Sequence, residues 1–363
     1  MILKNYSRLL VIAGLFLSVS ACKKDKQVDL NTIDLGLPST ISLVYGQEQD
    51  ISLPASLRNA PDASISLDFS QVENIQVNTS TKLRDQLSRA IVFDKNTGYL
   101  HLNSLLLYPN STVSSTSGNK IPETYKVTVQ ASSKSQGIQA KQTFELRVSP
   151  AKLTIKGLDN QGAVPFAYVL YGDPATFELE APAAWLTNST WTLENKATLG
   201  TDVSFVSNKL SFGANAGDPA KKAEKAYDII PVLQKDGFTI ASKAFKVTFI
   251  PQIKFFYGTY YADLNLTILT NSIYIALSNG YLSAAPTLYP EQYKSTFSIT
   301  SIEKNGVTVD NKEGIFGIDE KTGSVIVKKN TTLKQGAYKF TVKAKTTTGM
   351  EFSTTLTLNM EEG

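Results

Sequence analysis

The chain has 363 residues, of which 42% are hydrophobic and 19% charged, and its formal net charge is +4. So small a charge gives no long-range attraction to polyanions, and we expect no nucleic-acid partner. A single cysteine and a single histidine exclude an internal disulfide and Cys/His zinc sites. The sequence therefore predicts neither a metal site nor a cofactor.

The first 21 residues have the features of a secretory signal peptide. Lys4 and Arg8 give a positively charged start, and the apolar run LLVIAGLFLSV is too short to span a bilayer as a permanent helix. Small residues then precede Cys22, as at a signal cleavage site. Without residues 1–21 the chain loses two basic residues, Lys4 and Arg8, so 34 of its 36 basic residues remain beside 32 acidic ones.

The residues Val19-Ser20-Ala21-Cys22 resemble the lipobox of bacterial lipoproteins. In that family the signal is cut before the cysteine, which is then acylated, so the resemblance implies lipidation at Cys22 with palmitate and a tether over 22–34. The alternative is an ordinary signal peptide with an accidental cysteine, but the polar KKDKQ that follows fits a solvated tether. Lys23 stands where lipoproteins of the inner membrane usually carry Asp. The resemblance thus implies a lipid anchor in the bacterial outer membrane, with the chain facing the periplasm or the surface.

A phrase with the pattern Asp-x-x-Thr-Gly occurs twice, as IVFDKNTGYLHL and 225 residues later as FGIDEKTGSVIV. In each copy Asp94 or Asp319 can accept backbone N–H groups, and Gly98 or Gly323 can supply a positive φ. The phrase therefore predicts a hairpin turn rather than a ligand site.

Each copy is followed by a pair of alternating segments. Apolar and polar residues alternate over 125–132 and again over 338–345, the period of a half-buried antiparallel strand. A turn at Gly137 or Gly349 and a second alternating segment come next. We expect each copy to end in a β-hairpin.

The chain divides by these patterns into three predicted domains. The middle part has alternating strands in ATFELEA and AFKVTFI but lacks the repeated phrase. We expect three tandem all-β sandwich domains at 35–149, 150–250 and 251–363, each of roughly 100 residues. Pro150 and Pro251 at the junctions favour short, stiff linkers.

The repeated turn and the strand after it resemble the "ID..TG.I" hairpin of cadherin-like and related bacterial immunoglobulin-like repeats. The match covers the first and third segments and is poor in the middle one. It implies an immunoglobulin-like β-sandwich fold. Cadherins bind calcium through acidic linkers, whereas SPAKLT and IPQIKF contain no carboxylate. The resemblance therefore implies the fold of these repeats but not their calcium binding.

Tyrosines are concentrated near the C-terminus: the stretch from Phe255 to Tyr293 holds seven of the sixteen. Strands favour tyrosine, and a sandwich core can bury it. Adjacent pairs such as Tyr260 and Tyr261, however, cannot both point inward on a regular strand. Exposed tyrosines suit stacking on sugar rings. The candidate ligand-binding residues are Tyr260, Tyr261, Asn279, Tyr281, Tyr289 and Tyr293.

The layout of a lipobox followed by immunoglobulin-like modules resembles the surface glycan-binding lipoproteins of Bacteroidota. It implies a non-catalytic cell-surface lipoprotein whose C-terminal domain binds polysaccharide through exposed aromatic residues. The alternative is an adhesin or a structural subunit of an outer-membrane assembly, in which the same residues contact a protein. We predict no catalytic residues and no enzymatic activity, since no pair of carboxylates stands out.

Overall fold

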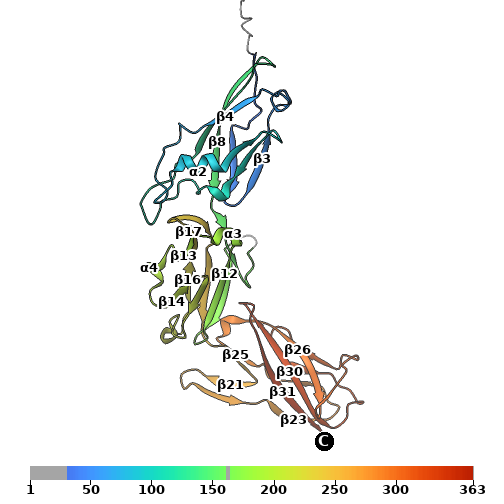
Figure 1. Ribbon diagram of the computed structural model, residues 1–363. Coiled ribbons are helices and arrows are strands. Elements are labelled where there is room, and N and C mark those ends of the chain that lie inside the picture. Colours follow the sequence, from blue (N-terminus) through green and yellow to red (C-terminus); the bar gives the residue numbers. More distant parts are fainter. Residues whose placement is uncertain (1–30, 161–163, 363) are drawn as a thin grey trace, which may run out of the picture. The chain divides into compact units, whose positions relative to one another are not determined.

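The computed structural model describes residues 31–160 and 164–362 (Figure 1). The predicted signal peptide and Cys22 lie outside these residues. Strands dominate the described part, and its longest helix is α2 (Leu83–Ala90). None of the described helices has the length and apolar character needed to cross a bilayer. The prediction of an all-β fold is confirmed.

The chain forms two compact units, and the first runs to Thr112 and resumes at Asn119–Ser149. Its larger sheet has the order β1 (Asn31–Thr32), β8 (Ile138–Ser149), β7 (Tyr125–Ser133) and β4 (Ser64–Asp68), with β2 (Thr40–Val44) parallel to β8. Its smaller sheet has the order β3 (Glu48–Ser52), β6 (Tyr99–Asn103) and β5 (Ile91–Asp94). The helical turns are α1 (Ala55–Arg58), α2 and η1 (Ser104–Leu106).

The second unit comprises Val113–Gly118 and the chain from Pro150 onward. Its first part contains three small sheets. The first has the order β10 (Thr154–Ile155), β12 (Ala175–Glu180), β15 (Lys209–Phe212) and β14 (Val203–Val206), and the second has the order β11 (Phe166–Leu170), β19 (Phe245–Ile250) and β16 (Lys225–Ile229). The third has the order β13 (Ser189–Leu193), β17 (Pro231–Lys235), β18 (Phe238–Ser242) and β9 (Ala151–Lys152). The helical turns are α3 (Ala183–Leu186), α4 (Lys196–Leu199) and η2 (Pro219–Lys221). Aromatic side chains such as Phe212, Phe245 and Phe249 fill the core.

The C-terminal part of this unit is built on the five-stranded sheet β23 (Ser272–Ala276), β31 (Glu351–Glu361), β30 (Gly336–Thr346), β26 (Lys294–Lys304) and β27 (Val307–Thr308) (Figure 1). Opposing strands are β24 (Tyr281–Leu282), β29 (Val325–Val327) and β28 (Phe316–Ile318). Two strand pairs complete it: β20 (Lys254–Phe256) with β25 (Thr287–Tyr289), and β21 (Gly258–Tyr261) with β22 (Leu266–Leu269). The turn η3 (Glu291–Tyr293) precedes β26.

Both predicted closing hairpins are present. In β7–β8, Val127 lies opposite Phe144, and in β30–β31, Phe340 lies opposite Leu356. All four side chains are fully buried, so the inward-facing side of each hairpin supplies the centre of a core, as the alternation predicts.

Both copies of the repeated phrase form the predicted turn. The carboxylate of Asp94 accepts hydrogen bonds from the N–H of Asn96 and the hydroxyl of Thr97, each at 2.8 Å. Asp319 accepts the backbone N–H groups two and three residues after it, at 2.8 and 2.9 Å. These hydrogen bonds lower the pKa of both carboxyl groups, because they favour the charged form. The aspartate of each phrase therefore makes its hydrogen bonds within its own turn.

The two cores of the second unit are joined by a third buried group, which we call the joint. Its fully buried members are Ile250, Leu288, Tyr293, Phe297 and Ala344. Tyr168 and Leu170 of β11 pack against it from the first part of the unit. The joint explains why residues 150–362 form one compact unit, while the division of this unit at Pro251 stays a prediction.

Candidate functional site

A cleft of about 470 Å³ lies at the surface of the second unit, beside β21 and β25. We call it the tyrosine cleft. Its lining includes Tyr171, Lys222, Gln252, Lys254, Tyr260 and Tyr289. Two of the six residues predicted to bind a ligand, Tyr260 and Tyr289, are therefore brought together here.

The floor of the cleft is an aromatic pair. The ring centroids of Tyr260 and Tyr289 are 4.9 Å apart, and the ring planes are inclined by 59°. Both side chains are half-buried, so part of each ring remains open to solvent. Such a pair offers a broad apolar surface edged by two hydroxyl groups.

Neighbouring side chains hold Tyr260 in place. Its hydroxyl donates a hydrogen bond of 2.8 Å to Oδ1 of Asn265, at the end of the β21–β22 turn. The ammonium group of Lys254 lies 4.7 Å from the ring centroid of Tyr260, within the range of a cation–π contact. Lys254 pairs with Tyr289 across β20 and β25. One short pair of strands therefore positions both the cation and the second ring.

The opposite wall comes from the first part of the unit. Gln252 donates from Nε2 to the carbonyl of Tyr171, and the hydroxyl of Tyr171 donates to the carbonyl of Ala223. Lys222, at the end of η2, also lines the cleft. The charged side chains among the described lining residues are Lys222 and Lys254, both cationic. The site can therefore combine stacking with hydrogen-bond donors.

Three other predicted residues lie outside the cleft. Tyr261 points to the opposite side of β21 from Tyr260, as alternation requires, and is 44% exposed. Tyr281 packs partly buried against the C-terminal core, and burial raises the pKa of its hydroxyl. Asn279 is exposed in the turn after β23. In this turn the N–H of Leu277 donates to the carbonyl of Glu361, the last residue of β31, and Asn279 is not among the residues that line the cleft.

Tyr293 differs most from expectation, because it is 2% exposed and belongs to the joint. Its hydroxyl donates to Oε1 of Glu224 at 2.8 Å. Burial, together with this hydrogen bond, raises the pKa of Tyr293 to about 12. A ring with so little exposed surface cannot stack on a ligand, so the expectation that the ring of Tyr293 is exposed is wrong.

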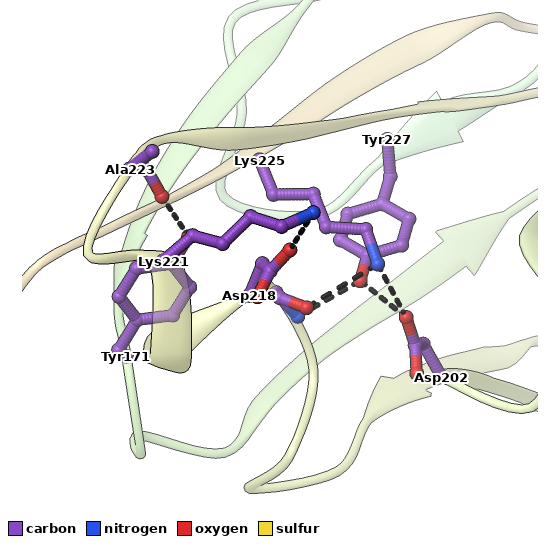
Figure 2. A network of polar contacts seen from close by, with 8 residues as sticks. Tyr171, Asp202, Asp218, Lys221, Ala223, Lys225 and Tyr227 are labelled. Carbon is purple, nitrogen blue, oxygen red and sulfur yellow. Dashed lines mark hydrogen bonds and ion pairs between the residues drawn. The ribbon is translucent and has the colours of Figure 1, made fainter.

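A second cleft, of about 500 Å³, lies beside a network of polar contacts in the first part of the unit (Figure 2). Oδ2 of Asp202 is 3.0 Å from Nζ of Lys225 and accepts the hydroxyl hydrogen of Tyr227 at 2.5 Å. The hydroxyl of Tyr227 in turn accepts the N–H of Gly217 at 2.8 Å. The pKa of Asp202 is lowered, mainly by the Tyr227 hydrogen bond. Since these groups satisfy one another, we assign the network a structural role.

No group of three or more His, Cys, Asp or Glu residues in the described part of the chain is arranged to hold a metal ion. The side chain of Asp173 lies 3.5 Å from Nε2 of Gln252, one of the residues that line the tyrosine cleft.

Residues 258–363 match a family described as "Surface glycan binding protein BT4661-like, N-terminal". The matched residues include Tyr260, Asn265 and Tyr289 but not the opposite wall of the cleft. No curated protein matches the chain.

The comparison with solved structures gives matches of low identity and low TM-score. At 12% identity, domains 3–5 of Drosophila OTK cover 92% of this chain and 97% of their own, with a TM-score of 0.32. Sidekick-1 immunoglobulin domains 1–4 cover 89% and 74%, with 12% identity and a TM-score of 0.31. Drosophila N-cadherin EC1-3 covers 92% and 99%, with 12% identity and a TM-score of 0.24. Such scores reflect loose superposition, and the family match is the finding that bears on the site: residues 258–363 are similar to the N-terminal module of surface glycan-binding proteins, as the sequence predicts.

Proposed function

We propose that this chain is a non-catalytic cell-surface protein that binds polysaccharide in the tyrosine cleft. The observation that carries the proposal is the Tyr260–Tyr289 pair, which is half-open to solvent and lies within the residues similar to a surface glycan-binding module. Pyranose rings have one face of C–H groups that packs on aromatic rings, while their hydroxyls need hydrogen-bond partners. The cleft offers both.

The polar residues have separate roles in this proposal. Lys254 and Lys222 supply ammonium donors to sugar oxygens, and the side chain of Asn265 keeps the Tyr260 ring from rotating. A fixed ring loses less conformational entropy when a ligand binds. We expect the rings to contribute most of the affinity and the lysines to orient the sugar.

The test is binding of the chain from residue 23 onward to a panel of soluble and insoluble polysaccharides, by affinity electrophoresis and pull-down. Tyr260→Ala and Tyr289→Ala should each weaken binding by about two- to tenfold, given about 0.5–1.5 kcal/mol for an aromatic contact beyond its buried area. Tyr261→Ala is the matched control, because it removes the same ring from the opposite face of β21. Equal loss in all three variants, or retention on no polymer, would contradict the proposal.

The lipid anchor is a separate part of the proposal. Cys22 lies outside the described residues, and the lipobox pattern alone supports it. Growth of cells with a radiolabelled fatty acid should label the wild-type chain but not Cys22→Ser. Proteinase treatment of intact cells then separates a surface-facing chain, which is digested, from a periplasmic one, which is protected.

The alternative function, an adhesin or a subunit of an outer-membrane assembly, has one observation in its favour. The side of β21–β22 that faces away from the cleft is apolar and uncovered. This surface is independent of the tyrosine cleft, so both activities can be tested in one set of variants.

A further inference from the structure

The hairpin β21–β22 exposes several large apolar side chains to solvent. All four residues of β22 are exposed, and Leu264 in the turn is 69% exposed. The two strands form a sheet with no third strand among the described residues. An isolated pair of strands is marginally stable in water, and exposed apolar patches mark contact sites.

The pairing register places three of the exposed apolar side chains on one face, whereas Leu269, opposite Gly258, projects to the other. Tyr261 lies opposite Leu266, and Thr259 lies opposite Ile268. Residues directly opposite in an antiparallel pair project to the same side. Tyr261, Leu266 and Ile268 therefore form one apolar surface, the hairpin face, and each is 44–48% exposed. The tyrosine cleft lies on the other side, with Tyr260.

The outer edge of β22 lacks the features that usually protect an edge strand. The sequence LNLTILTN contains no charged residue and no proline, and the sole charge of the hairpin is Asp263 in its turn. Charges, prolines and bulges are the devices that prevent edge-to-edge pairing. This edge is therefore open to a further strand.

We propose that β22 pairs with β22 of a second copy of this chain, giving a four-stranded antiparallel sheet across a two-fold axis. Two-fold symmetry requires each pair of opposite residues to share a face. In the register that pairs most apolar surface, Leu266 of each copy lies opposite Ile268 of the other copy. The axis then passes between the two Thr267 residues, which lie opposite each other.

This edge suits a partner that pairs through its main chain better than one that needs a broad contact surface. Standard interfaces use about 20–30 residues from each side, whereas the hairpin offers only a few apolar side chains beside one strand. An edge of four to six residues suits main-chain pairing with another strand. Because neither edge is charged, identical copies meet no electrostatic repulsion.

The first test is sedimentation equilibrium of the chain from residue 23 onward over a wide range of concentration. We expect a reversible monomer–dimer equilibrium. Leu266→Lys/Ile268→Lys puts cations opposite each other across the axis and should make the chain monomeric at every concentration. Tyr274→Lys, at a 72% exposed site on β23, should leave the equilibrium unchanged. A wild-type chain that stays monomeric, or a dimer that survives the double lysine variant, overturns the proposal.

The second test locates the axis. Opposite residues in antiparallel strands have Cα atoms about 4.5–5.5 Å apart, which a disulfide can bridge. The chain from residue 23 contains no cysteine, so Thr267→Cys can form only an intermolecular disulfide. It should cross-link on mild oxidation at least tenfold faster than Thr259→Cys, which lies on the inner strand of the same hairpin. Equal rates would refute the register. Polysaccharide binding should be unchanged in Leu266→Lys/Ile268→Lys, so failure of either proposal leaves the other standing.

Discussion

The repeated turn provides a matched pair of substitutions, Gly98→Ala and Gly323→Ala. Both glycines have left-handed φ values, +73° and +80°, and each donates its N–H to the carbonyl of the turn aspartate at 2.8 Å. A Cβ atom on Gly98 would lie 2.5 Å from Cγ of Arg58, which is exposed and can move. A Cβ atom on Gly323 would lie 2.8 Å from Cγ of Pro286 and 3.0 Å from Cδ1 of Phe297, both buried.

The expected magnitudes follow from these contacts. An alanine in the left-handed region costs about 1–2 kcal/mol at either site. Overpacking against side chains that cannot move adds about 1–3 kcal/mol at Gly323 alone. We expect Gly98→Ala to lower the free energy of unfolding by about 1–2 kcal/mol and Gly323→Ala by about 2–5 kcal/mol.

Differential scanning calorimetry of the whole chain measures both effects, since the glycines lie in different compact units. Each kcal/mol should lower the transition temperature of the affected unit by about 2–4 °C. Gly349→Ala, where nothing lies within 4 Å of the new Cβ, reports the backbone strain alone. If Gly98→Ala is as damaging as Gly323→Ala, the reasoning from fixed and movable neighbours is refuted.

Three further substitutions test the cores and the polar network. Because the pKa of Asp202 is lowered in the folded state, its stabilisation is present above the unfolded value near 3.8 and is lost as the pH falls through the folded value. Urea unfolding at stepped pH should therefore show a smaller acid-induced loss of stability for Asp202→Asn than for wild type. Tyr125→Phe removes a buried 2.5 Å hydrogen bond to the carbonyl of Tyr108 and should cost about 0.5–1.5 kcal/mol in the same assay. Phe340→Ala empties a fully buried site and should cost about 3–5 kcal/mol; a cost below 1 kcal/mol would show that the site collapses.

Local pattern was enough to predict the strands and the turns. The alternation at 125–132 and 338–345 predicts β7 and β30, because a half-buried strand needs a period of two. The Asp and Gly of the repeated phrase predict the turn, because both residues act within five positions of each other. Strands and turns of this kind depend on residues that are close in the sequence, so the sequence predicts them.

The set of residues that lines the cleft could not be predicted from local sequence patterns. Alternation predicts that Tyr260 and Tyr261 point to opposite sides, but it does not say which side faces a cleft. Lys254 meets Tyr289 only because β20 pairs with β25, which lies more than 30 residues later. Tyr171, Lys222 and Gln252 reach the cleft through long-range packing. No short motif marks these residues, so sequence reasoning missed them.

The same long-range packing explains the error over Tyr293. A proline- and serine-containing stretch indicates a loop, and loops are usually exposed. Here the loop crosses the boundary between two cores, and Phe297 and Ile250 enclose the ring. Its surroundings include Ile250 and Glu224, which lie far from it in the sequence.

The joint has a thermodynamic consequence for the cleft. Tyr171 belongs to the first core of the unit and Tyr260 to β21 of the C-terminal part, so a ligand that contacted both would require the two parts to keep their relative position. By linkage, such a ligand would stabilise the packing of the joint by the free energy with which that packing favours its binding. A substitution in the joint, for example at Tyr293, should therefore change the affinity of a ligand that the substituted side chain does not touch.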